Sequence, residues 1–158
     1  MKKNEKTNVM RILEQHKCTY QSYNYLDTGV VSGTEVARVL NQNPDQVFKT
    51  LVTVGASKNY YVFMVPVEKE LQLKEAAKAV GEKSIAMIKE KELLPLTGYV
   101  HGGCSPIGMK KQFCTVIDSS AADFDTIIFS GGKIGYQVET SLAELEKIVK
   151  FSLAEISH

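Results

Sequence analysis

Two adjacent runs of β-forming residues constrain the fold of this chain more than any other segment. They occupy residues 47–67, with the sequence VFKTLVTVGASKNYYVFMVPV, and both runs are rich in Val, Phe and Tyr. The polar, turn-like segment GASKN lies between them. The pattern therefore predicts two neighbouring strands joined by a tight turn.

Strand and helix signals cover most of the remaining chain. The further predicted β runs are residues 20–26, 83–88, 114–118, 126–130 and 136–140, with a hairpin turn at 131–135. The predicted helices are residues 8–17, 32–40, 73–81, 89–96 and 141–150, together with a short helix whose first turn contains Pro44. Capping boxes mark two helix starts, Ser32 with Glu35 and Ser141 with Glu144. We expect Gly81 to end one helix, Pro95 to stop another, and the helix at 141–150 to close the chain.

The order of these elements predicts the fold class. Hairpin-type connections between strands are common, which favours a mixed, mainly antiparallel α+β fold over a doubly wound parallel sheet. No repeat, low-complexity tract or linker divides the 158 residues, so we expect a single domain over residues 1–158.

Charge and cysteine content exclude several classes of protein. Nineteen Lys and Arg face eighteen Asp and Glu, and the net charge of +1 excludes a strongly basic nucleic-acid coat but not a local basic patch. The three cysteines, Cys18, Cys104 and Cys114, form no CxxC pair, so no zinc site, disulfide framework or cofactor is predicted. The N-terminal MKKNEKTNVM has no apolar signal-peptide core, and no apolar run approaches about 18 residues. We expect a cytoplasmic protein without membrane contact.

The densest cluster of unusual residues is GYVHGGCSPIGMKKQF, residues 98–113, which holds four glycines. Adjacent Gly102 and Gly103 allow consecutive backbone N–H groups to turn toward one point and hold an anion or a carbonyl oxygen. The alternative is a tight turn between two elements, the usual reason for clustered glycines. The spacing matches neither GxGxxG nor a P-loop, so a nucleotide-phosphate loop of either kind is not predicted.

Lysines add positive charge to the same motifs. Lys49 lies inside an apolar β run, where it either snorkels to the edge or projects into a cavity as a cation for a carboxyl or phosphate group. Lys110, Lys111 and Lys133, together with Gly132, are either phosphate contacts or ordinary solvated surface.

Cysteine and tyrosine side chains suggest two further kinds of functional site. Cys104 and His101 suggest a nucleophile and its base, but neighbours in one loop are no evidence of catalytic geometry, and most lone cysteines are small apolar fillers. Tyr20, Tyr23 and Tyr25 either stack on a nucleic-acid base or pack in the core.

Four segments together resemble the YbaK/EbsC family, free-standing relatives of the editing domain inserted in bacterial prolyl-tRNA synthetases. The segments are NPDQVFKTLV, LKEAAKAVGEKSIAM, TGYVHGGCSPIGMKK and TIIFSGGKIGYQVE, and the resemblance runs from about Leu13 to about Val149. It implies a curved, barrel-like, mainly antiparallel sheet with short helices packed outside. It also implies an aminoacyl-tRNA deacylase that removes cysteine from proline tRNA, with Cys-tRNA(Cys) as a further substrate and prolyl-tRNA synthetase as a partner.

The resemblance also assigns site residues. It implies that Lys49 is the key lysine, that Tyr25 lines the pocket, and that the Gly-Gly-x-Ser-Pro loop consists of Gly102, Gly103, Ser105 and Pro106. Two positions depart from relatives: Cys104 stands where they carry an aliphatic residue, and Gln137 stands where some carry an aspartate. Neither is therefore placed in the core site.

The mechanism that the resemblance suggests needs no enzymic base. The thiolate of the substrate cysteine attacks its own carbonyl and leaves as a small cyclic thioester, while the enzyme orients the ester and stabilises the oxyanion. We expect backbone N–H groups near Gly102 and Gly103 to face the carbonyl oxygen, and Lys49 to orient the terminal phosphate-ribose or the aminoacyl group. Two alternatives stay open: a non-catalytic module that binds aminoacyl-tRNA or a synthetase, and a hydrolase with Cys104 as nucleophile.

Overall fold

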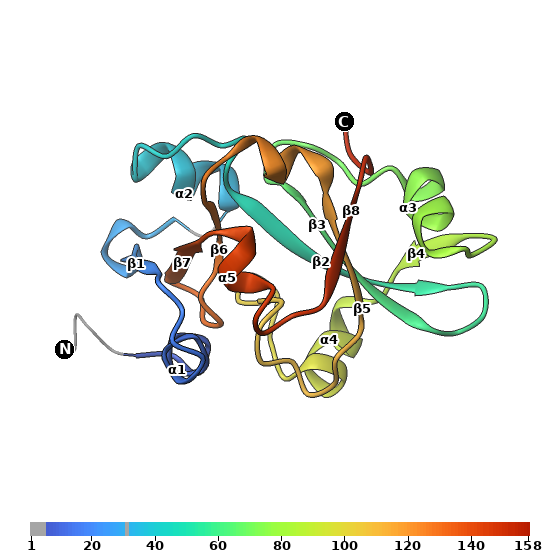
Figure 1. Ribbon diagram of the computed structural model, residues 1–158, viewed down its shortest axis with the longest axis horizontal. Coiled ribbons are helices and arrows are strands. Elements are labelled where there is room, and N and C mark those ends of the chain that lie inside the picture. The colour runs from blue at the N-terminus through green and yellow to red at the C-terminus, as the bar shows by residue number, and fades with distance from the viewer. Residues whose placement is uncertain (1–5, 31) are drawn as a thin grey trace.

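The strands of the computed structural model, which describes residues 6–30 and 32–158, form two sheets (Figure 1). The N-terminal ten residues are predicted to hold no signal-peptide core, and residues 1–5 of them lie outside the described residues. The larger sheet has the order β4-β2-β3-β5-β8, with bounds Ile85–Met87, Phe48–Gly55, Tyr60–Pro66, Cys114–Asp118 and Phe151–Ala154. The smaller sheet has the order β1-β7-β6, with bounds Gln21–Asn24, Tyr136–Thr140 and Ile127–Ser130.

The predicted hairpin over residues 47–67 is confirmed as the centre of the larger sheet. Strands β2 and β3 are antiparallel, with Phe48 opposite Pro66 and Val54 opposite Tyr60. Strand β4 adds antiparallel to one end of β2, whereas β5 and β8 add in parallel beyond β3. The smaller sheet is wholly antiparallel, and its β6–β7 pair confirms the hairpin predicted around residues 131–135. The sheets are therefore mixed and mainly antiparallel, as expected.

A short parallel bridge joins the two sheets. Val47 pairs with Ile128, and the Ile128 N–H donates to the Gln46 carbonyl at 3.0 Å. No closed barrel forms among the described residues, so the expected barrel-like sheet is not confirmed.

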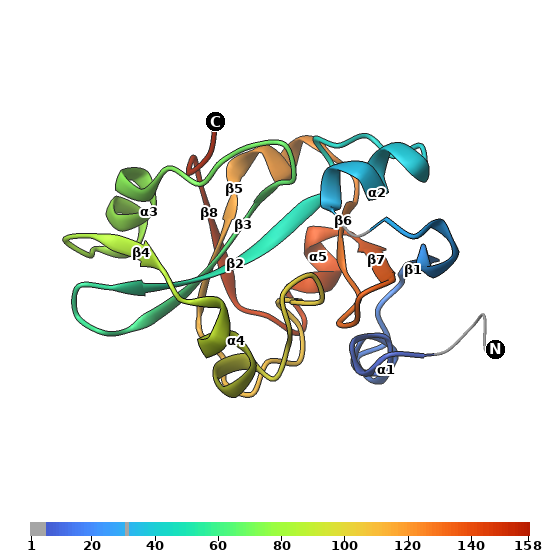
Figure 2. The same ribbon diagram turned by 180° about the vertical axis from the view of Figure 1, so that it is seen from behind.

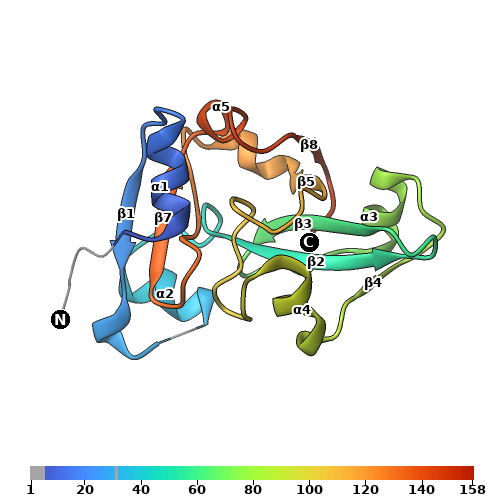
Figure 3. The ribbon, with the colours of Figure 1, turned by 90° about the horizontal axis from the view of Figure 1, so that it is seen from below.

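Five short helices accompany the sheets in the described residues: α1 Asn8–Gln15, α2 Gly33–Val39, α3 Leu73–Val80, α4 Glu90–Thr97 and α5 Leu142–Leu145. Figure 3 shows α3 and α4 on opposite sides of the β2–β3 hairpin, with α1 beside the smaller sheet. None of the helices in the described chain is long and apolar enough to cross a membrane.

The β2–β3 hairpin buries both of its faces, because successive side chains of a strand point to opposite sides. Val52, Val62 and Met64 pack into a core that includes Leu93 of α4. Phe63 and Val65 pack into a second core that includes Ala76 and Ala77 of α3. The segment thus fills two cores, which explains its nearly continuous apolar sequence.

Helix starts follow the sequence signals, since the Ser32 and Ser141 hydroxyls accept the N–H groups of Glu35 and Glu144 at 3.3 and 3.1 Å. Gly81, with a φ of +75°, ends α3 as expected.

Pro95 does not stop its helix, and that prediction is wrong. It lies inside the last turn of α4, which continues to Thr97 and ends at Gly98 with a φ of +88°. Proline this near the end of a helix removes only one backbone hydrogen bond, and the left-handed glycine supplies the actual stop.

Two other helix predictions are also wrong, the short helix around Pro44 and the helix expected to close the chain. In both places the chain pairs with a strand instead. The segment around Pro44 is a turn rather than a helix, because Val47 directly after it joins the bridge to Ile128. Helix α5 ends at Leu145, and the chain closes with strand β8, which pairs in parallel with β5 from Thr115 to Asp118. Residues 151–154, which the sequence signals did not predict as a strand, therefore form one because they pair with the open edge of β5.

Candidate active site

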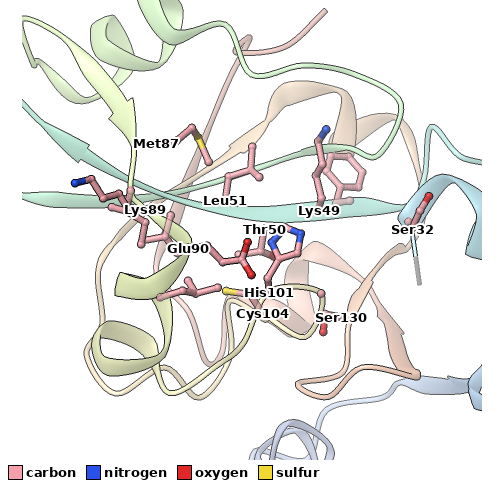
Figure 4. Close-up of a pocket in the computed structure, with 16 residues that line it drawn as sticks. Ser32, Lys49, Thr50, Leu51, Met87, Lys89, Glu90, His101, Cys104 and Ser130 are labelled. Carbon is pink, nitrogen blue, oxygen red and sulfur yellow. The ribbon is translucent and has the colours of Figure 1, made fainter. Parts of the chain in front are cut away.

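A cavity of about 440 Å³ lies along the edge of β2 (Figure 4). Strand β4 pairs with β2 only over Thr53–Gly55, and the bridge to the smaller sheet uses Val47. The Ile88 N–H, just after β4, donates to the Val52 carbonyl at 3.4 Å, so residues 48–51 are the part of β2 without a neighbouring strand on that side within the described chain. The cavity is lined by Ser32, Gly33, Phe48, Lys49, Thr50, Leu51, Val52, Met87, Ile88, Lys89, Glu90, Leu93, His101, Gly102, Cys104 and Ser130.

The glycine-rich loop forms one wall of this cavity. It follows α4 and turns back toward the β6–β7 hairpin, as Figure 2 shows. The loop is held by buried contacts of its own: Tyr99 donates its hydroxyl to the Ile107 carbonyl, and the Ser105 hydroxyl accepts the Ile107 N–H at 3.3 Å. Ser105 and Pro106 are buried and do not line the cavity. Both residues shape the loop from behind.

Gly103 makes the close approach that the glycine cluster suggested, but to the protein itself. A Cβ atom at this position would lie 3.1 Å from the Ile134 backbone nitrogen and 3.4 Å from the Lys133 carbonyl carbon. The Gly103 N–H donates to the Val100 carbonyl at 3.0 Å. This N–H is therefore bound within the protein, whereas the expectation for N–H groups near Gly102 and Gly103 concerned the carbonyl oxygen of the substrate.

The neighbouring N–H groups differ from that of Gly103. Gly102 and Cys104 both line the cavity, and neither backbone N–H has a hydrogen-bond acceptor among the described residues. Gly102 has a φ of +88°, a conformation that glycine adopts without steric cost. Gly102 and Cys104, on either side of Gly103, thus combine a place in the cavity wall with an N–H that has no acceptor among the described residues.

Lys49 lies at the border of the cavity with its ammonium group turned outward. Its Nζ is 3.5 Å from Oε2 of Glu70, and its side chain is 31% exposed. Figure 4 shows the ammonium pointing away from His101 and Cys104. Alternation along β2 explains this, because Phe48 and Val52 belong to the core that contains Cys104, whereas Lys49 projects from the opposite face.

Tyr25 and the other predicted lysines do not line the cavity. Tyr25 is buried just after β1, and its N–H donates to the Gly135 carbonyl at 2.8 Å. The exposed side chain of Lys110 reaches the Pro95 carbonyl at 3.4 Å, and Lys111 is exposed beside it.

The hairpin residues predicted as possible phosphate contacts, Gly132 and Lys133, also lie outside the cavity. Gly132 has a φ of +95°, and a Cβ atom there would lie 2.7 Å from a methyl group of Val9. Lys133 is exposed at the hairpin that backs the glycine-rich loop. The two residues are therefore close to the loop but contribute no cavity wall.

Cys104 lines the cavity as a buried thiol. Its relative exposure is 8%, and burial raises the pKa of the thiol to about 12. A thiol of that pKa is almost wholly protonated at neutral pH, so it is a poor nucleophile. The structure thus disfavours the Cys104 nucleophile.

Several polar residues that were not assigned to the site also line the cavity, among them Thr50, Glu90 and His101, of which His101 was weighed only as a base for Cys104. The Thr50 hydroxyl oxygen is buried there without a hydrogen-bond partner among the described residues. Glu90 at the start of α4 and His101 in the loop are exposed to the cavity. Thr50 directly follows Lys49 in sequence, which was a usable signal, whereas Glu90 looks like any charged residue in a first helical turn.

The described residues contain no group of three or more His, Cys, Asp and Glu side chains placed to hold a metal ion. The cavity instead offers backbone donors, hydroxyls, one imidazole and one carboxylate beside an apolar wall. Such a lining can hold a small polar group and transfer a proton, and it defines a candidate small-molecule or ester-binding site.

Comparison with solved structures shows a known fold. The crystal structure of hypothetical protein APE2540 superposes with a TM-score of 0.86 and 20% identity, covering 96% of this chain and all of that one. A structure described as "a putative trans-editing enzyme for prolyl tRNA synthetase" superposes with a TM-score of 0.82 and 21% identity, covering 98% and 99% of the two chains.

Sequence comparison shows the family. The model of the aminoacyl-tRNA editing domain matches residues 28–148. An Enterococcus faecalis protein named "Putative Cys-tRNA(Pro)/Cys-tRNA(Cys) deacylase EbsC" is 42% identical over 157 residues, which cover 99% of this chain and 96% of that protein. The chain belongs to the aminoacyl-tRNA editing domain family.

Proposed function

We propose that the protein hydrolyses the ester of mischarged Cys-tRNA(Pro), and also of Cys-tRNA(Cys). The similarity to the Enterococcus faecalis relative over nearly the whole of both chains carries this proposal. The cavity supports it, since 440 Å³ is within the size range of small-ligand pockets and suits an aminoacyl group and part of a ribose.

The backbone N–H groups of Gly102 and Cys104 are the proposed oxyanion donors. Both are without an acceptor in the described structure and both belong to the cavity wall, whereas Gly103 fixes the loop against the hairpin. Preorganised donors of this kind stabilise charge that develops on a carbonyl oxygen.

Lys49 is the proposed contact for the terminal phosphate-ribose. Its ammonium lies at the cavity border, and its partner Glu70 has a side chain that is 82% exposed. An exposed ion pair is weak, so an incoming phosphate can replace the carboxylate at little cost. Lys110, Lys111 and Lys133 are proposed to contact phosphates farther from the ester, with Gly132 shaping the hairpin beneath them.

Attack by the substrate thiol is the proposed chemistry. It removes the need for an enzymic nucleophile, in keeping with the protonated state that burial imposes on Cys104. It also supplies discrimination that size cannot, because one methylene is worth only about 1–3 kcal/mol of selectivity.

The setting of the enzyme is part of the same proposal. We infer a single cytoplasmic deacylase domain over residues 1–158, with prolyl-tRNA synthetase as the partner that supplies tRNA specificity. The C-terminal segment supports the single domain, since the Ile156 N–H donates to the buried Asp118 carboxylate at 3.0 Å.

Purified protein with proline tRNA charged separately with Cys, Ala and Pro tests the proposal. We expect rapid deacylation of Cys-tRNA(Pro), also in the presence of EDTA, and little cleavage of Pro-tRNA(Pro). Tight binding of Cys-tRNA without turnover would instead establish the non-catalytic binding module.

A further inference from the structure

Glu90 and His101 enter the cavity from different elements. Glu90 is the first residue of α4, and His101 belongs to the loop that follows this helix. Figure 4 shows the Glu90 carboxylate and the His101 ring pointing toward one another across the cavity. A histidine and a carboxylate in one cavity are groups that general acid-base catalysis often uses.

The proposed reaction needs a proton to move between two substrate atoms. The thiol must lose its proton as the S–C bond to the carbonyl carbon forms, and the ribose oxygen must gain one as the C–O ester bond breaks. The products are the cyclic thioester of cysteine and tRNA with a free hydroxyl, and water then opens the thioester. A single imidazole can accept the first proton and return it to the ribose oxygen.

We propose that His101 carries this proton from the substrate thiol to the ribose oxygen, with Glu90 orienting its ring. This inference rests on the proposed deacylase function and adds an acid-base residue to it. His101 is well placed, because Gly102 beside it lines the same cavity and its N–H has no acceptor among the described residues. The oxyanion and the transferred proton are then handled by adjacent parts of one loop.

The other charged groups near the cavity point away from the ring or lie behind the loop. Lys49 lies on β2 with its ammonium turned outward to Glu70, and Lys89 precedes Glu90 and points away from the ring in Figure 4. Lys133 is exposed on the hairpin behind the loop, and burial keeps the Cys104 thiol protonated. Glu90 is therefore the charged group that faces the ring.

Single-turnover deacylation of Cys-tRNA(Pro) with saturating enzyme, measured from pH 5.5 to 8.5, tests the inference. For the wild type we expect a rate that rises with pH and then levels off, because transfer through a general base no longer depends on pH once the base is unprotonated. For His101→Gln we expect a rate on the order of 100-fold lower at pH 7. Its residual rate should rise tenfold per pH unit toward the thiol pKa of about 8.5, without levelling.

Glu90→Gln provides a readout that a purely structural role would not give. Loss of the carboxylate that faces the ring should lower the single-turnover rate while the affinity for Cys-tRNA stays unchanged. His16→Gln is the matched control, since His16 is exposed directly after α1 with its Nδ1 2.9 Å from the Ile12 carbonyl oxygen. That variant should retain the wild-type rate and profile.

The outcomes separate this inference from the function on which it rests. A wild-type protein that does not cleave Cys-tRNA overturns the deacylase proposal. An active wild type with an unchanged rate and pH profile in His101→Gln overturns the role of His101 alone. An effect of His101→Gln confined to the affinity for tRNA makes His101 a binding contact and also overturns the proton-transfer role.

Discussion

Lys49 Nζ lies 3.5 Å from Glu70 Oε2, across the border of the cavity rather than inside it. The two residues come from β2 and from the segment between β3 and α3, so the ion pair exists only in the folded chain. Because the Glu70 side chain is 82% exposed, the pair holds the Lys49 ammonium at the border of the cavity without burying it.

Lys49→Ala should lower deacylation of Cys-tRNA(Pro) by about 100-fold or more, because the cation proposed to orient the substrate is lost. The melting temperature should change little, since exposed ion pairs contribute about 0–1 kcal/mol. Single-turnover kinetics and thermal unfolding monitored by circular dichroism measure both quantities. Lys78→Ala is the matched control, because Lys78 pairs with Glu75 on α3 at 3.6 Å outside the cavity. A folded Lys49→Ala protein with near-normal turnover would rule out the role.

Gly103→Val should be severely impaired, and Gly103→Ala less so. The added atoms collide with the backbone of residues 133–134, which lies 3.1–3.4 Å from the Cβ position and cannot rotate away as a side chain can. We expect the collision to displace Gly102 and Cys104, which line the cavity and whose N–H groups are the proposed oxyanion donors. Gly81→Ala, at a left-handed position with open space around it, controls for simple loss of stability. Full activity of Gly103→Val at a temperature where it is folded would contradict the loop's role.

Cys104→Ala should retain deacylation within a few-fold of wild type. A thiol with a pKa of about 12 is almost wholly protonated at pH 7 and is therefore a poor nucleophile. Its free energy of unfolding should fall by roughly 1–2 kcal/mol, since a buried side chain loses part of its packing. Kinetics and urea unfolding measure the two effects separately. Loss of turnover with intact tRNA binding would revive the nucleophile hypothesis.

Cys-tRNA should be cleaved far faster than Ser-tRNA on the same tRNA, with similar binding of both. Serine replaces sulfur by oxygen at nearly the same shape, but its hydroxyl is far less acidic than a thiol of pKa about 8.5. Filter binding and single-turnover rates on the two esters provide the comparison. Comparable cleavage rates would contradict attack by the substrate thiol and favour activated water.

Asp118 should make the protein sensitive to acid. Its burial alone would raise the pKa of the carboxyl, but hydrogen bonds from Ser120, Ile156 and Ser157 outweigh this and lower the pKa. A folded-state pKa below the unfolded value of about 3.9 stabilises the protein above that pH, and the contribution is lost as pH falls through the folded-state pKa.

Asp118→Asn tests that linkage through melting temperatures between pH 7 and pH 2. The variant should be less stable than wild type at pH 7, and the difference should narrow in the acid range. Asp123→Asn, which changes an exposed carboxylate nearby, should follow the wild-type curve. A constant difference between Asp118→Asn and wild type at every pH would refute the assignment.

Local sequence signals determined much of the secondary structure. The apolar run of residues 47–67 specified its hairpin, Ser32 and Ser141 specified helix starts, and Gly81 specified a helix end, because each signal acts within one turn or one strand pair. The prediction was wrong where a distant partner decided the outcome: residues 151–154 became a strand only because β5 offered an open edge.

The features of the candidate site also fall into those that the sequence shows and those that only the tertiary structure shows. The sequence by itself located Lys49 and the glycine-rich loop, since both stand out against their neighbours and match the family's motifs. Only the tertiary structure decided that Lys49 faces outward, that Gly103 packs against the hairpin, and that Glu90 and His101 share a cavity with Thr50. Strand alternation fixes the face of a side chain only once the partners on each face are known. The cavity itself exists because β4 and Ile88 cover one part of the β2 edge and leave residues 48–51 open, a consequence of three-dimensional pairing that no local pattern records.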